Sequence, residues 1–229
     1  MKNLLLSTGR LAKILSFKTE IDRFLLRSIG FSLVLLTARI VSTHSLLSAS
    51  LAWNLLLAWF PYCISGWLYR NTALIKNKGI YAGIFLVWLL FIPNSFYIIT
   101  DLFHLHDDRN APLWFDLLLI FSFAWNGLLM GILSIRSMEK ITQVFIPFKH
   151  DWGFLYPVMW LNALGVYIGR YLRYNSWDVV ANPFSLTTDM LRLLMHPILH
   201  KNEWAMVFSY AVFMTMLYIT IKKISKMIW

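Results

Sequence analysis

Six long apolar segments alternate with short polar connections along most of the chain. They lie at about residues 28–44, 47–69, 80–100, 113–135, 152–172 and 204–221. Each is close to the roughly 20 residues that cross a bilayer as an α-helix. The pattern therefore predicts an all-α fold, a polytopic membrane helix bundle with about six transmembrane helices.

The first 27 residues are too polar to span a membrane. Within them Leu11, Ile14, Leu15, Ile21 and Leu25 recur near helical spacing, with lysine and arginine between them. This pattern is typical of a basic amphipathic helix that lies in the membrane interface. We therefore divide the chain into a basic amphipathic cytoplasmic segment, residues 1–27, and a single transmembrane helical domain, residues 28–229.

The composition agrees with this division. Hydrophobic residues make up 59% of the chain and charged residues only 14%, and the mean hydropathy is +0.60, all typical of an integral membrane protein. A net charge of +10 would indicate nucleic-acid binding in a soluble protein, but here the basic residues stand at the ends of apolar segments. We therefore expect the lipid bilayer as partner and no nucleic acid. The oligomeric state stays open.

Lysine and arginine also predict the orientation. The amino-terminal segment carries six, and the regions after the second, fourth and last apolar segments carry three each. Both termini are therefore expected to be cytoplasmic, in a multi-pass protein of the cell membrane. The opposite side then receives five of the six histidines, a skew that the charge rule does not explain and that hints at function.

Pro93 stands inside the third apolar segment and is followed by polar residues. Proline lacks a backbone donor, so this helix should kink there. If the helix continued, five polar side chains would share a face at spacings of three and four: Asn94, Tyr97, Asp101, His104 and Asp108. Ionisable groups near membrane depth line a cavity or site by default. Alternatively, Asn94 and Ser95 only satisfy the backbone groups that the proline frees.

The end of the fifth apolar segment carries a second motif. Arg170 and Arg173 stand three apart, and guanidinium groups suit phosphate or carboxylate recognition. Snorkelling to the interface, or pairing with Asp101 or Asp178, explains them equally well. Asp101 itself opposes the dipole at a helix carboxyl end, so it should have a positive partner, with Arg39, Arg170 and Arg173 as candidates.

Several residues could bind a divalent metal such as zinc. The run from Asp101 to Asp108 is dense in ligand types and includes His104, His106 and Asp107. His196 and His200 stand four apart, and on a helix both imidazoles could reach one zinc ion. A histidine pair at this spacing also arises by chance. The HExxH, GxSxG and phosphate-loop motifs are absent from the sequence.

The residues from Trp88 to Asn94, with Tyr97, Thr100, Asp101 and His104, and the run from Gly169 to Asp178 also carry a resemblance. Over roughly residues 45–220 the chain resembles a bacterial family of predicted integral membrane proteins, known only as a domain of unknown function of the 1361 type. The resemblance implies the fold and the positions of the two motifs. It implies no reaction.

Three functions are compatible with these features. The first is a membrane-embedded enzyme that acts on a lipid or lipid-linked anionic group at an extracytoplasmic cavity where the two motifs converge. Its catalytic residues would be Asp101, His104 and Asp178, its substrate-binding residues Asn94, Tyr97, Arg170, Arg173 and Asn175, and its metal ligands His104, His196 and His200. The second is an accessory or assembly protein whose polar faces only pair helices. The third is a small transporter with Asp101 as its ion or proton site.

Overall fold

The computed structural model describes residues 20–45, 47–71, 77–105, 111–144 and 152–227. These residues form helices and no strand, which confirms the all-α fold. The chain divides into two compact units, Met1–Ile141 and Thr142–Trp229, and each is described by itself. The prediction of a single domain over residues 28–229 stays a prediction.

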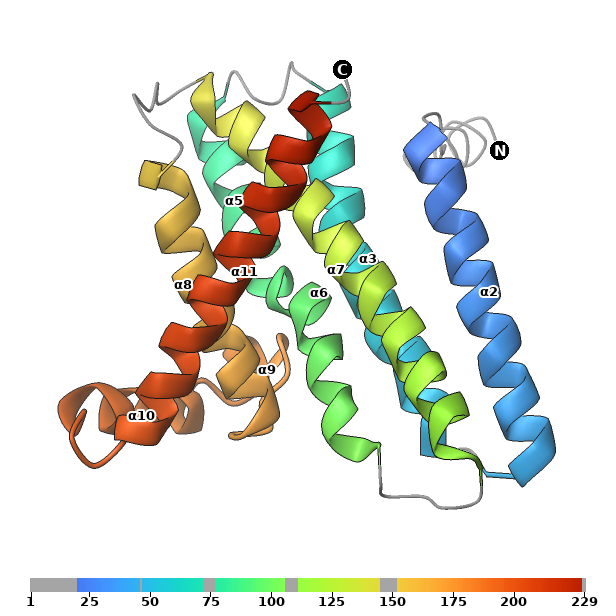
Figure 1. The fold of residues 1–229 in the computed structure, drawn as a ribbon. Coiled ribbons are helices and arrows are strands. Elements are labelled where there is room, and N and C mark those ends of the chain that lie inside the picture. Colours follow the sequence, from blue (N-terminus) through green and yellow to red (C-terminus); the bar gives the residue numbers. More distant parts are fainter. Residues whose placement is uncertain (1–19, 46, 72–76, 106–110, 145–151, 228–229) are drawn as a thin grey trace, which may run out of the picture. The chain divides into compact units, whose positions relative to one another are not determined.

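Unit 1 is built from long helices that run in alternating directions (Figure 1). They are α2 (Glu20–Thr43), the 3₁₀ turn η1 (Leu47–Ala49), α3 (Ser50–Arg70), α5 (Lys78–Phe91), α6 (Pro93–Tyr97), the 3₁₀ helix η2 (Ile98–His104) and α7 (Leu113–Gln143). Its apolar core draws residues from α2, α3, η2 and α7, with Leu36, Leu55, Ile98 and Leu119 among them. The core therefore joins segments that are far apart in the sequence.

Within the described part of the chain, five helical segments are long and apolar enough to cross a membrane: Glu20–Thr43, Ser50–Arg70, Lys78–His104, Leu113–Gln143 and Lys201–Ser225. The predicted segment at 152–172 also forms a helix, α8 (Trp152–Arg170), of 19 residues. It is not among the five, because Pro157, Asn162 and several Trp and Tyr residues make it less apolar. Five of the six predicted spans therefore have the expected apolar character.

The helix ends differ from the predicted ones because helical hydrogen bonding continues past the apolar residues that marked each segment. The first helix begins at Glu20 rather than near residue 28, and the fourth runs on to Gln143. Residues 20–27 of the predicted interfacial segment thus belong to α2. Residues 1–19 lie outside the described part of the chain.

The third predicted span is broken at Pro93, as expected. The helix α5 ends at Phe91, Pro93 opens the short helix α6, and the chain then tightens into the 3₁₀ helix η2. Proline fits the first turn of a new helix because its missing N–H has no partner to lose there. The Nδ2 of Asn94 donates to the carbonyl of Phe91 at 3.0 Å, so this amide repairs part of the break.

The short helix α6 packs closely against α7, and two glycines allow this approach. A Cβ on Gly127 would lie 2.8 Å from the carbonyl oxygen of Ser95, and a Cβ on Gly131 would lie 2.7 Å from the ring of Phe96. The two glycines stand four apart on one face, the small-residue spacing of close helix pairs in membranes. On the other side, Ser95 Oγ donates to the carbonyl of Ala58 in α3 at 3.2 Å.

Neutral polar side chains connect the helices of unit 1 between its ends. Ser134 Oγ of α7 donates to the carbonyl of Pro61 at 2.9 Å and accepts from Trp88 Nε1 at 2.8 Å. Asn126 Nδ2 of α7 donates to Ser32 Oγ of α2 at 2.9 Å. Such bonds hold helices together where water is absent, and they carry no net charge.

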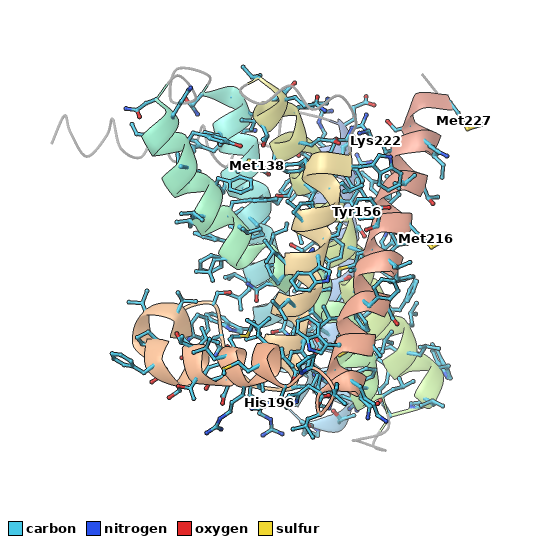
Figure 2. All side chains as sticks on the ribbon, turned by 90° about the vertical axis from the view of Figure 1, so that its left-hand side faces the viewer. Met138, Tyr156, His196, Met216, Lys222 and Met227 are labelled. Atoms are coloured by element: carbon cyan, nitrogen blue, oxygen red, sulfur yellow. The ribbon has the colours of Figure 1, made fainter. Side chains whose placement is uncertain are left out.

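Unit 2 contains α8, α9 (Asp178–Ala181), α10 (Pro183–Met195) and α11 (Lys201–Met227). The long helices α8 and α11 pack along each other, and the rings of Trp160 and Trp204 stack with centroids 5.5 Å apart. The helix α10 lies crosswise at one end of this pair (Figure 1). Figure 2 shows His196 at that end and Lys222 and Met227 at the other end of α11.

Candidate functional site

Four polar side chains lie near the ends of α2 and η2 and the starts of α3 and α7, and Figure 1 shows these helix ends at one end of unit 1. They are Arg39, Asn54, Asp101 and Asp116, and we call them the end cluster. Each comes from a different helix. If the predicted orientation is correct, this end faces away from the cytoplasm.

Hydrogen bonds join the members of the end cluster in pairs. Arg39 Nε donates to Asp116 Oδ1 at 2.6 Å, and its Nη2 donates to Asp116 Oδ2 at 3.3 Å. This two-pronged contact is the strong geometry for a guanidinium and a carboxylate. Asn54 Nδ2 donates to Asp101 Oδ2 at 2.9 Å. The first pair ties α2 to α7, and the second ties α3 to η2.

The charged members of the end cluster are buried. Arg39 is 2% exposed, and Asp101 and Asp116 are each 7% exposed. Removing charges from water is costly unless they are paired and hydrogen-bonded, so these bonds are a condition for their burial. Buried ionisable groups in a membrane protein are a candidate site by default.

The end cluster lies next to the apolar core of unit 1. Three members of the cluster each have a core residue one helical turn away in the sequence. These core residues are Leu36 before Arg39, Ile98 before Asp101, and Leu119 after Asp116. The core therefore closes the cluster on its inner side.

The 3₁₀ geometry of η2 changes the face predicted for the third span. With three residues per turn, Ile98, Asp101 and His104 align, whereas the face expected from a continuous α-helix does not form. Asp101 is buried while His104 is exposed. Asn94 and Tyr97 are half-buried in α6, and Asp108 lies outside the described residues. Asp101 and His104 are therefore neighbours in two different environments.

The structure adds Asn54 as a partner of Asp101, and pairing of Asp101 with Arg39 stays a prediction. Arg39 binds Asp116, and the bond from Asn54 to Asp101 was not predicted. Arg170 and Arg173 belong to unit 2. Pairing of Asp101 with either of them, and convergence of the two motifs on one cavity, stay predictions.

The motif after α8 folds into a helix cap. Arg173 has a left-handed φ of 60°, and the N–H of Tyr174 donates to the carbonyl of Ile168 at 3.3 Å. The left-handed backbone at Arg173 is the conformation that glycine usually supplies just after a helix, and the bond to Ile168 closes the carboxyl end of α8. Arg173 is exposed and Arg170 is half-buried. The cap therefore sends the chain away from α8 and presents the Arg173 side chain at its turn.

Asp178 stabilises the turn that follows. Its carboxylate accepts from the backbone N–H of Asn175 at 2.6 Å and from Asn182 Nδ2 at 3.0 Å. These bonds favour the ionised form, the backbone N–H of Asn175 most, and lower the pKa of Asp178. Nearby, Tyr174 Oη donates to Asp189 Oδ2 at 2.9 Å, which raises the pKa of Tyr174. Catalytic and binding roles for Asp178 and Asn175 stay predictions.

The two histidines proposed as a zinc pair do not share a helix. The helix α10 ends at Met195, His196 has φ −123° and ψ 58°, and a turn leads to α11. The physical reason is Pro197, because a residue before proline avoids the α region. His200 Nδ1 lies 3.5 Å from Glu203 Oε1. The helix face that would align the two imidazoles therefore does not form, and zinc binding by this pair stays a prediction.

No group of three or more His, Cys, Asp or Glu side chains within the described residues is placed to hold a metal ion. His104 lies in unit 1, whereas His196 and His200 lie in unit 2. His106, Asp107 and Asp108 lie outside the described residues. Metal binding therefore stays a prediction.

Sequence reasoning missed Asn54 and the pairing of Arg39 with Asp116. A signal for the pair was present. Arg39 interrupts the first apolar segment, and Asp116 interrupts the start of the fourth. Opposite charges inside membrane spans tend to pair with each other. Two further buried acids were also missed: Glu139 of α7, and Asp22, which accepts from the hydroxyl of Tyr62 at the other end of unit 1. Asn54 had no such signal, because asparagine in an apolar segment has many uses.

Comparisons with known proteins place these motifs in a family. No curated protein and no solved structure matches the chain. A family model described as "Protein of unknown function (DUF1361)" matches residues 53–217, a range that holds Asn54, Asp101, Asp116 and the whole of the motif after α8. The chain therefore belongs to this family of proteins of unknown function.

Proposed function

We propose that this membrane protein is an enzyme that acts on a lipid or lipid-linked anionic group at the end cluster of unit 1. Asp101 is the proposed acid–base residue. The observation that carries the proposal is that three buried charged side chains and one amide, from four different helices, form two hydrogen-bonded pairs at one end of an apolar core.

The contrast with the middle of unit 1 supports this choice. Helix pairing in the middle of the unit uses neutral groups, such as Ser134 with Trp88 and Asn126 with Ser32. Neutral bonds are sufficient to join helices and avoid the cost of burying charge. Charged groups at the end of the unit therefore call for a further reason, and reaction with a polar ligand supplies one.

The remaining predicted site residues have defined roles in this proposal. His104 exchanges protons with Asp101, its neighbour one 3₁₀ turn away, while Asn94 and Tyr97 orient groups nearby. In unit 2, Arg170 and Arg173 stay predicted anion-binding residues, beside Asn175 and Asp178. Binding of a divalent metal such as zinc by His104, or by His196 and His200, stays a separate prediction within each unit, and a bound metal would activate water or polarise the anion.

An accessory role without catalysis is the second candidate. The observation that favours it is that each bond of the end cluster joins two helices, and that the third-span motif packs between α3 and α7 through Ser95. In that case the polar residues specify helix pairing, and Asp101 contributes only to assembly.

The membrane lipids of a strain that lacks the gene separate the two candidates. Lipid extracts would be analysed by mass spectrometry after complementation with the wild-type chain, with Asp101→Asn, or with Asp189→Asn as a control in unit 2. We expect the deletion to change the amount of at least one anionic lipid or lipid-linked species. The wild type and the control should restore it, and Asp101→Asn should not, at equal protein levels in the membrane.

Two results would contradict the enzyme. Full restoration by Asp101→Asn would exclude Asp101 as the acid–base residue. An unchanged lipid profile in the deletion strain would favour the accessory role, which would then be tested by isolating protein partners from the membrane.

A further inference from the structure

We infer that α10 and the turn to α11 form an interfacial element that inserts into one leaflet of the bilayer at the end of α11 that begins with Lys201. The partner is the lipid surface itself. The inference is independent of the proposed enzyme, because it concerns how unit 2 sits in the membrane.

The helix α10 has three different sides. One side packs on its own unit through Leu193, which is buried, and whose carbonyl accepts from Trp204 Nε1 at 3.2 Å. A second carries Ser185, Asp189 and Arg192, at spacings of three and four. The third carries large apolar side chains that nothing in the described part of the unit covers. With those of the following turn they are Phe184, Leu191, Met195, Ile198 and Leu199, each between 51% and 87% exposed.

Two threonines beside the apolar side strengthen this reading. Thr187 Oγ1 donates to the carbonyl of Pro183 at 2.6 Å, and Thr188 Oγ1 donates to the carbonyl of Phe184 at 2.8 Å. Both residues are exposed, yet neither hydroxyl needs water because its donor is already satisfied within the helix. The third side of α10 can therefore leave water at little cost.

The position of α10 along the chain identifies lipid as the occupant. The segment Lys201–Ser225 is long and apolar enough to cross a membrane, so its first turn marks the membrane boundary. Leu199 stands two residues before Lys201, and α10 lies crosswise at this same end of α8 and α11 (Figure 1). The exposed apolar surface continues along α11 with Phe208, which is 66% exposed. A helix held at that depth meets the lipid headgroups and the first carbons of the chains.

The polar side of α10 also fits a position at the membrane–water interface. Arg192 has a side chain that is 71% exposed, and it lies 3.8 Å from Asp189. With its polar side toward water and its apolar side toward the acyl chains, α10 should lie with that apolar side about 5–10 Å into the headgroup boundary.

Spin labelling of the full chain in liposomes tests the inference. Cysteines would be placed singly at Leu191, Met195 and Ile198, with Arg192→Cys as the matched control on the polar side, in a Cys63→Ser background. Collision of the nitroxide with oxygen, which concentrates in lipid, would be compared with collision with a water-soluble nickel chelate. Labels at Leu191, Met195 and Ile198 should collide more often with oxygen than with the nickel chelate. The label at Arg192 should collide more often with the nickel chelate.

Two outcomes would overturn the inference. Equal nickel access at all four positions would place α10 in water, and immobile labels shielded from both reagents at Leu191 and Met195 would indicate a protein partner. Gel filtration of each variant confirms that it is folded, and a label at Phe208 provides the reference for a lipid-exposed position on α11.

Discussion

The acids Asp101 and Asp116 of unit 1 and Asp178 of unit 2 are all buried, but they are stabilised in different ways. Asp116 and Asp101 receive their bonds from residues 77 and 47 positions away, on other helices. Asp178 receives its bonds from residues three and four positions away in the same turn. The end cluster therefore exists only when the helices of unit 1 have assembled, whereas the turn at Asp178 is a local structure.

This difference bears on function. A carboxylate that fixes its own turn has an adequate structural explanation, and its sequence neighbours reveal it. Burying a carboxylate that is bonded to a distant helix costs free energy, and the other interactions of the assembled protein must offset this cost. The end cluster is therefore the better candidate site, and the following changes test the contrast.

The largest effect is expected for Arg39→Met. This change leaves the carboxylate of Asp116 buried without its guanidinium and should lower the free energy of unfolding of unit 1 by about 3–5 kcal/mol. Titration of the detergent-solubilised protein with a denaturing detergent measures it. The double variant Arg39→Met/Asp116→Leu should recover most of the loss, and an equal loss in the double variant would show that the ion pair is not the cause.

The next effect is expected for Asn54→Ala, which removes the donor to the buried carboxylate of Asp101. The loss in unfolding free energy should be about 1.5–3 kcal/mol, the range for hydrogen bonds to charged groups. Asn71→Ala is the control on the same helix, because Asn71 is exposed and donates to the carbonyl of its own turn at Trp67. If both variants lose the same stability, the bond to Asp101 contributes nothing specific.

A change in the packing beneath the end cluster should have a similar or smaller effect. In Gly127→Ala the new Cβ would lie 2.8 Å from the carbonyl oxygen of Ser95, so α6 and α7 must separate, at a cost of about 1–3 kcal/mol. Gly30→Ala has nothing within 4 Å of its Cβ and should be neutral or slightly stabilising. Thermal unfolding in detergent ranks the two, and the reverse order would refute the close packing of α6 on α7.

The smallest global effect is expected for Asp178→Asn. The turn at residues 175–182 should loosen, with faster hydrogen exchange of the Asn175 amide, while the midpoint of thermal unfolding stays unchanged. Because the fold lowers the pKa of Asp178, its contribution is present above the usual pKa of an aspartate and is lost as the pH falls through the lowered value. The protection of the Asn175 amide in the wild type, measured relative to the intrinsic exchange rate at each pH, should therefore fall over that acidic range. A lower midpoint in Asp178→Asn would show that this acid also supports global assembly.

Much of the fold follows from the chain itself. Apolar runs near the length that crosses a bilayer predicted the helices, and Pro93 predicted the break in the third span, because both depend on neighbours within one segment. Pro197 carried equally local information, since it ends α10 before His200 can share its helix. The two glycines of α7 were a readable signal for the close approach of α6.

The tertiary structure alone decided the composition of the end cluster. Which acid binds Arg39, and that Asn54 donates to Asp101, depends on the order in which helices pack and on the 3₁₀ tightening of η2, and no spacing within a segment encodes these choices. The sequence by itself determined an all-α membrane protein with two polar motifs, because the cost of exposing polar groups to hydrocarbon acts on every segment separately. The pairing of buried charges required the assembled unit, because the paired side chains are far apart in the sequence and come within a few ångströms of each other only after the helices have packed.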